Sequence, residues 1–287
     1  MRKTILYILT LVIMGHVGLV SCEHEIDFDY PVAESVLVFE GRISNEDLFV
    51  QISHSRPMAD STKNHFISDA RVWIVCDDGS EEQLVYDERG KCYISPSGLV
   101  GIPGHTYQMR ATVEGRDYHA TATMQPPAPL DTTYFRWVKV LSERIFFVCL
   151  KGTDAYPDDR MKNYYLCRLM RDGEVFRWNP RSGRSSVNGT YEYDILCSSE
   201  KEIDKGEGEY NDKPLIDGDT IIVELMSLDR HCWSYFQSLV YIQSTNANPI
   251  SNIEGEGAQG IFMAANISRG DTLVFNKKEV LSHKEGE

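Results

Sequence analysis

Apolar and polar residues alternate with a period of two over residues 34–125. Phe39 and Ile43 share one side of the first such segment, and Glu40 and Arg42 lie on the other. Because successive side chains of a strand point to opposite faces of its sheet, this pattern predicts a series of half-buried β-strands.

Glycine-containing turns separate these segments. Asp78-Gly79 interrupts the alternation, and glycine accepts the positive φ that a tight hairpin turn needs. A second corner, Gly101 to Gly104, precedes Tyr107; in immunoglobulin-like sandwiches a tyrosine at such a corner bonds its hydroxyl back to nearby backbone. Seven short strands in residues 34–125 therefore predict an immunoglobulin-like Greek-key β-sandwich.

The proline-rich segment 126–129 ends this series of strands. Proline has no backbone N–H to donate to a neighbouring strand, and it favours an extended backbone. We interpret it as a linker to a second, β-rich domain over residues 130–287. Period and composition predict strands there at 134–140, 145–151, 163–171, 174–178, 191–197, 220–227, 260–268 and 272–275. The predicted fold is thus mainly β, in two domains.

One helix is expected within the second domain, at about residues 229–246. Asp229 is a good N-cap, and Asn248-Pro249 stops the helix. Between them, apolar residues recur at three- and four-residue spacing: Trp233, Phe236, Val240 and Tyr241. The aromatic residues could line a ligand stripe, but at this spacing a packed core is favoured.

The N-terminal segment is typical of a bacterial lipoprotein signal. Arg2-Lys3 precedes an apolar stretch that is shorter than the roughly 20 residues of a membrane-spanning helix, and Ser21-Cys22 follows it. We expect cleavage of residues 1–21 and attachment of a lipid to the Cys22 sulfur, which would hold the protein to a membrane. An ordinary secretory signal with an accidental cysteine is the alternative.

Residues 22–33 form an acidic tether, with Glu23, Glu25, Asp27 and Asp29 directly after Cys22. In some bacteria such a stretch directs lipoproteins to the outer face of the outer membrane; the alternative is a solvated linker. The formal net charge of the whole chain is −14. A nucleic-acid partner is therefore not expected, because phosphate binding needs a positive field.

Six cysteines follow Cys22. They are Cys76, Cys92, Cys149, Cys167, Cys197 and Cys232. Three disulfides between them would fit an exported protein, with Cys76–Cys92 and Cys149–Cys167 as the natural sequence neighbours, and free buried thiols are the equal alternative. The spacing matches no zinc motif, so we expect no metal and no cofactor.

Residues 198–219 hold many acids interleaved with glycines. Such oxygen-rich loops can bind calcium, but the EF-hand pattern is absent and a solvated loop is favoured. Motifs for zinc hydrolysis, nucleophile elbows, P-loops and dinucleotide binding are also absent. The sequence therefore predicts a protein that is not an enzyme.

Several short motifs resemble one family in order along the chain. They are Val38-Phe39-Glu40-Gly41-Arg42-Ile43-Ser44, Ala70-Arg71-Val72-Trp73-Ile74, the Gly101 to Tyr107 corner, and Asn248-Pro249-Ile250-Ser251-Asn252-Ile253-Glu254-Gly255 followed by Gly260-Ile261-Phe262. Together they resemble the domain-of-unknown-function 4249 family of bacterial lipoproteins. The resemblance implies an outer-membrane lipoprotein encoded near a TonB-dependent transporter, and it implies no catalytic residue. The charged segment 254–259 departs from the compact glycine turn expected there.

The leading hypothesis is a surface-exposed outer-membrane lipoprotein that assists a TonB-dependent transporter, by capturing a nutrient or covering the transporter's mouth. An adhesion or structural surface module is the alternative, since folds do not settle function. Ligand residues remain unassigned. A cleft between the two domains, with the loops 200–219 and 251–260, is where we expect binding.

Overall fold

The computed structural model describes residues 35–56, 65–141, 143–205, 214–245 and 247–282. The predicted signal peptide, Cys22 and the acidic tether lie outside these residues. All of these described residues belong to one compact unit. Within the described ranges, no helix has the length and apolar content needed to span a bilayer.

The first part of this unit consists of short strands, as the alternating pattern predicts. Their bounds are β1 (Leu37–Ser44), β2 (Leu48–His54), β3 (Arg71–Cys76), β4 (Glu81–Gln83), β5 (Val85–Asp87), β6 (Cys92–Ile94), β7 (Thr106–Val113) and β8 (Arg116–Thr123). Gly79 has a φ of +89° in the turn between β3 and β4, where glycine is the residue that tolerates this angle. The Asp78-Gly79 turn is thereby confirmed.

The second part consists mainly of longer strands. They are β9 (Leu130–Val140), β10 (Glu143–Thr153), β11 (Tyr164–Arg171), β12 (Glu174–Ser182), β13 (Thr190–Ser199), β14 (Thr220–Leu228), β15 (Ala258–Arg269) and β16 (Leu273–Val274). The helices are α2 (Glu200–Lys205), α3 (Arg230–Thr245) and α4 (Lys277–Ser282), and two 3-10 turns cover Arg160–Lys162 and Gly183–Ser185. Helix α3 lies where the sequence predicts a helix, whereas α2 and α4 were not predicted.

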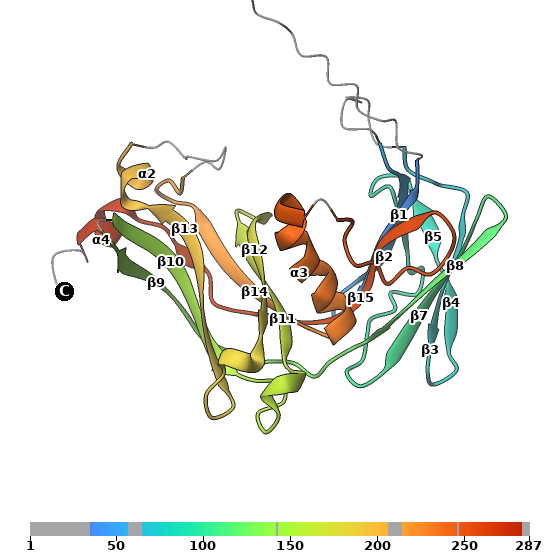
Figure 1. The fold of residues 1–287 in the computed structure, drawn as a ribbon, viewed down its shortest axis with the longest axis horizontal. Coiled ribbons are helices and arrows are strands. Elements are labelled where there is room, and N and C mark those ends of the chain that lie inside the picture. Colours follow the sequence, from blue (N-terminus) through green and yellow to red (C-terminus); the bar gives the residue numbers. More distant parts are fainter. Residues whose placement is uncertain (1–34, 57–64, 142, 206–213, 246, 283–287) are drawn as a thin grey trace, which may run out of the picture. The chain divides into compact units, whose positions relative to one another are not determined.

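The strands form three sheets (Figure 1). A long sheet has the order β12-β11-β14-β15-β1-β2-β6-β5, with β16 beside β14; β4-β3-β7-β8 and β13-β10-β9 form the other two. One core contains Phe39, Ile43, Ile74 and Met109, between the β1 end of the long sheet and the β3-β7 sheet. A second core fills the space between β11-β14 and the three-stranded sheet. The prediction of a mainly β, sandwich-like fold is confirmed.

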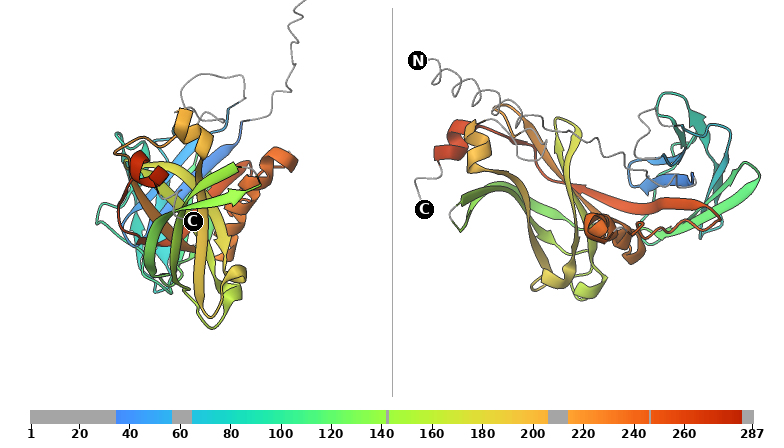
Figure 2. Two further views of the ribbon diagram at one scale, coloured as in Figure 1. Left: turned by 90° about the vertical axis from the view of Figure 1, so that its left-hand side faces the viewer. Right: turned by 45° about the horizontal axis from the view of Figure 1, so that its top comes forward.

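Strand β15 links the two parts of the long sheet. It pairs with β1 in parallel, from Leu37 opposite Ala258 to Ser44 opposite Ala265, and its far end pairs with β14 in antiparallel fashion. In the right-hand view of Figure 2, the orange-red β15 runs beside the blue β1. The predicted sandwich of residues 34–125 therefore includes a strand from much later in the chain, and the boundary at 126–129 stays a prediction.

Tyr107 confirms the predicted corner. Its hydroxyl accepts a hydrogen bond from the Ile102 backbone N–H at 2.8 Å, and its side chain is buried. This bond ties the loop before β7 to the strand itself.

The two cysteine pairs suggested by sequence order do not lie on neighbouring strands. Cys76 ends β3 and Cys92 begins β6, which belong to different sheets, and the same holds for Cys149 on β10 and Cys167 on β11. All six described cysteines are free thiols. Neither suggested pair therefore lies on neighbouring strands of one sheet, and the disulfide pairing stays a prediction.

Candidate functional site

A polar cleft of about 430 Å³ lies between β8 and the segment that follows α3. Its wall on the sheet side is the end of β8, and its other walls are the start of α3 and residues 250–254. The lining residues are Thr121, Ala122, Thr123, Asp229, His231, Ile250, Ser251, Asn252, Ile253 and Glu254. The cleft thus adjoins the loop 251–260 that the sequence analysis selected.

Asp229 fixes the helix side of this cleft. One carboxylate oxygen, Oδ1, accepts a hydrogen bond from the Cys232 N–H at 2.8 Å, which is the N-cap that the sequence predicts. The other oxygen, Oδ2, accepts from the Thr123 N–H at the end of β8 at 2.9 Å. A single carboxylate therefore joins α3 to the sandwich.

Asn252 fixes the opposite wall. Its Nδ2 donates to the Phe262 carbonyl oxygen at 2.7 Å, and its Oδ1 accepts from the Phe262 N–H at 2.9 Å. This pair of bonds copies the pattern that a neighbouring strand would offer to β15. The segment is consequently held in place next to the sheet.

At the Glu254 end of the cleft, the segment after α3 pairs with His119 of β8. His119 and Glu254 exchange backbone hydrogen bonds of 3.0 and 2.8 Å, and their side chains approach to 3.0 Å between Nε2 and Oε2. Gly255 follows with a φ of +144°, and a Cβ there would lie 2.2 Å from Cδ1 of Tyr118. Glycine is therefore required where the chain crosses β8.

The cleft offers hydroxyl, amide and imidazole groups to a ligand. Thr121 and His231 are exposed, and Ser251 is half-buried. Both carboxylates of the cleft already bond to protein groups, so the lining suits a polar ligand held by hydrogen bonds more than a strongly charged one. Pockets with a few placed polar groups on a fixed frame are where small ligands bind.

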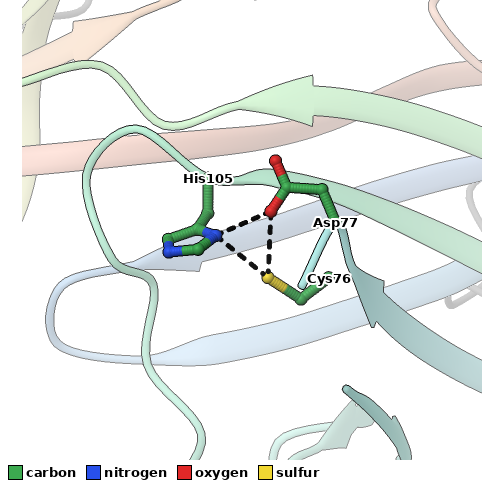
Figure 3. Close-up of side chains that lie close together, drawn as sticks. All are labelled: Cys76, Asp77 and His105. Atoms are coloured by element: carbon green, nitrogen blue, oxygen red, sulfur yellow. Dashed lines mark hydrogen bonds and ion pairs between the residues drawn. The ribbon is translucent and has the colours of Figure 1, made fainter. Parts of the chain in front are cut away.

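A second cluster lies at the open end of the β3-β7 pair (Figure 3). The Cys76 Sγ is 3.6 Å from Nδ1 of His105 and 3.5 Å from Oδ1 of Asp77, and the His105 Nδ1 to Asp77 Oδ1 distance is 2.6 Å. Three different donor atoms, a sulfur, a nitrogen and an oxygen, thus converge on one point.

This cluster does not have the arrangement of a nucleophilic triad. In such a triad the histidine uses one ring nitrogen toward the nucleophile and the other toward the carboxylate. Here Nδ1 of His105 faces both the thiol and the carboxylate. Burial also raises the pKa of the Cys76 thiol, whereas a reactive cysteine needs a lowered one.

The Asp77 carboxylate is held in its ionised form. The hydrogen bond from His105 lowers the pKa of Asp77, and the Thr106 N–H, which donates to Oδ2 at 3.0 Å, lowers it further. Asp77 and His105 are both partly open to solvent, so the cluster is accessible from outside.

This cluster was not predicted from the sequence because His105 lies 28 residues after Asp77. Cys76 pairs with Tyr107 across the β3-β7 ladder, which places Asp77 opposite the residues just before Tyr107. The sequence does contain a usable signal. Pairing the strand before the Asp78-Gly79 turn with the strand after the Tyr107 corner would have placed Cys76 and Asp77 near His105.

The remaining predicted site residues have varied positions. Cys22 and residues 206–213 of the acidic loop lie outside the described residues. Cys149, Cys167, Cys197 and Cys232 are buried, and burial raises the pKa of the first three thiols to about 12. On α3, Phe236 packs against the first core, as the core interpretation predicts. Val240 and Tyr241 are 50% and 56% exposed, so the core interpretation is wrong for these two residues, which lie on the solvent side of the helix.

Comparison with known proteins identifies a matching family. Residues 23–271 match a family described as Domain of unknown function (DUF4249), which agrees with the resemblance inferred from the short motifs. No match was found among curated proteins.

Proposed function

The chain belongs to the family described as Domain of unknown function (DUF4249), and from its own residues we propose a lipid-anchored capture protein of the bacterial outer membrane. It faces the cell exterior, binds a polar ligand without transforming it, and passes the ligand to a TonB-dependent transporter. The Ser21-Cys22 signal and the acidic tether support the anchor and its location. The family resemblance supports the transporter.

The observation that carries the capture role is the polar cleft beside β8. Asp229 joins the start of α3 to β8, and Asn252 holds the segment 250–254 to β15. A site held in this way is ready for a ligand before the ligand arrives, which lowers the ordering cost of binding.

Filling the cleft tests this role. Thr121 is exposed and lines the cleft, so Thr121→Trp should obstruct it while the backbone of β8 keeps its pairing. Thr272→Trp is the matched control, because Thr272 is also an exposed threonine but lies outside the cleft. When the captured nutrient limits growth, we expect cells with the cleft variant to grow slowly and cells with the control variant to grow normally. Equal growth of both would contradict the capture role.

Copurification tests the partner and the anchor. A tagged protein extracted in mild detergent should bring down an outer-membrane barrel, and Cys22→Ala should lose fatty-acid labelling and accumulate as precursor. Repeated isolation without a barrel would remove the transporter from the proposal. Altered cell attachment with unchanged nutrient growth would favour the alternative, an adhesion module.

A further inference from the structure

We propose that Cys76, Asp77 and His105 bind a thiophilic divalent cation, with Zn²⁺ as the best-matched ion. The set combines one thiolate, one imidazole nitrogen and one carboxylate oxygen, all of which are zinc ligands in proteins. This site is separate from the cleft, and the inference does not depend on the proposed capture role.

The ligand spacing supports this assignment. Zinc bonds of about 2.3 Å to sulfur and about 2.0 Å to nitrogen or oxygen put tetrahedral ligand atoms roughly 3.3 to 3.6 Å apart. The observed Sγ to Nδ1 and Sγ to Oδ1 distances are 3.6 and 3.5 Å. The Nδ1 to Oδ1 distance of 2.6 Å is that of a hydrogen bond. It must lengthen by roughly 0.7 Å when the metal replaces the shared proton.

The backbone holds two of the three ligands in fixed relation. Asp77 donates its N–H to the Thr106 carbonyl at 3.0 Å, and its Oδ2 accepts from the Thr106 N–H at 3.0 Å. Cys76 is the last ladder residue of β3, opposite Tyr107. The His105 side chain, which is 34% exposed, has the freedom to make the small adjustment.

Binding is balanced by the loss of one proton. The Cys76 thiol releases its hydrogen to solvent and becomes a thiolate. Neutral His105 moves its one hydrogen through solvent from Nδ1, where it is shared with Asp77, to Nε2, so that Nδ1 binds the metal. Asp77 binds through Oδ1 as a carboxylate. With three protein ligands, the fourth position is open to water, and the nearby carboxylate of Asp78 adds negative charge at this end of the sheet.

Cobalt is the spectroscopic probe for this site. Titration of Co²⁺ into the full-length protein in detergent should give one equivalent bound per chain, with a sulfur-to-cobalt charge-transfer band that Zn²⁺ abolishes by displacement. Cys76→Ser should remove the band, and Asp77→Asn and His105→Gln should each weaken Zn²⁺ binding at least about tenfold. Cys92→Ser, the other half-buried cysteine, is the matched control and should bind like the unaltered protein.

A second measurement needs no substitution. Zn²⁺ should slow alkylation of Cys76 at least about tenfold, as followed by peptide mass analysis, and leave alkylation of Cys92 unchanged. The proposal is overturned if the cobalt band is absent or persists in Cys76→Ser. Equal alkylation of Cys76 with and without Zn²⁺ would overturn it as well.

Discussion

The phenol of Tyr93 is buried and hydrogen-bonded on both sides of its oxygen. Its O–H donates to the Ile67 carbonyl at 2.9 Å, and its oxygen accepts from the Ala70 N–H at 2.8 Å. Burial raises the pKa of Tyr93 from 10.0 to about 12. The folded protein therefore favours the neutral phenol more strongly than the unfolded chain does.

This shift predicts a loss of stability at alkaline pH. Because the folded pKa is the higher one, the contribution of Tyr93 is complete below pH 10 and is lost as the pH rises through about 12. Tyr93→Phe should lower the free energy of unfolding at neutral pH by about 1–2 kcal/mol and reduce its fall above pH 10. Urea unfolding at a series of pH values measures both effects.

The control for this prediction is Tyr241→Phe, because the Tyr241 side chain is 56% exposed. Burial also raises the pKa of Tyr165 and Tyr191, so Tyr93→Phe should keep part of the alkaline loss. An unchanged pH dependence in Tyr93→Phe would contradict the role given to Tyr93.

At the scale of elements, Asp229 serves both α3 and β8. Asp229→Ala removes the helix cap and the bond to the Thr123 N–H together. We expect the free energy of unfolding to fall by about 2–3 kcal/mol, measured by urea denaturation. Asp271→Ala changes an exposed aspartate and should stay within about 0.5 kcal/mol of the unaltered protein. Similar losses in both variants would argue against the double role.

The elements that the sequence predicted are those with local causes. The alternation in β7 and β8, the Asp229 cap and the Tyr107 corner all depend on residues close together in the chain, and each was recovered. The short helix α2 has only 6 residues, too few to show a helical period.

Relations between elements were harder to predict. The parallel pairing of β1 with β15 leaves no local trace in either strand, and neither does the approach of His105 to Cys76. The candidate metal cluster was missed for this reason, although its strands were found. The loop 251–260 was chosen for its glycines and polar residues, and its attachment through Asn252 depends on β15.

At the scale of the whole molecule, Glu224 joins strands from both parts of the long sheet. It is buried, and it accepts from Arg168 Nε at 3.0 Å and from Arg269 Nε at 3.0 Å. Arg269 also reaches Glu46, next to β1. Strands β11, β14 and β15 therefore share one charge network with the β1-β2 turn.

Removing the buried charge should be costly. Glu224→Gln leaves two arginines without their shared partner, and we expect a loss of roughly 2–4 kcal/mol in the free energy of unfolding. Glu46→Gln removes the more exposed acid of the same network and should cost about 1 kcal/mol or less. Thermal and urea unfolding measure the loss of stability in both variants. A larger loss in Glu46→Gln than in Glu224→Gln would contradict this prediction.

The position of β15 also predicts the behaviour of fragments. A chain of residues 35–125 contains β1 to β8 but lacks β15, which pairs with β1 and packs Phe262 against Gly41. We expect this fragment to show no cooperative thermal transition by circular dichroism, whereas residues 35–287 should show one. A cooperative transition in the short fragment would instead support an independent domain ending at residues 126–129.

The late position of β15 in the sequence also affects when the protein can fold during its synthesis. The Asn45 side chain donates from Nδ2 to the Ile267 carbonyl and accepts at Oδ1 from the Ile267 N–H, although the two residues are 222 positions apart. At ordinary rates of translation the ribosome needs roughly 10 to 45 s to cover that distance. During this interval the nascent β1 has an open edge and no permanent neighbour on that side. We therefore expect the chain to stay unfolded, and able to pass through a narrow channel, until nearly all of it has been made.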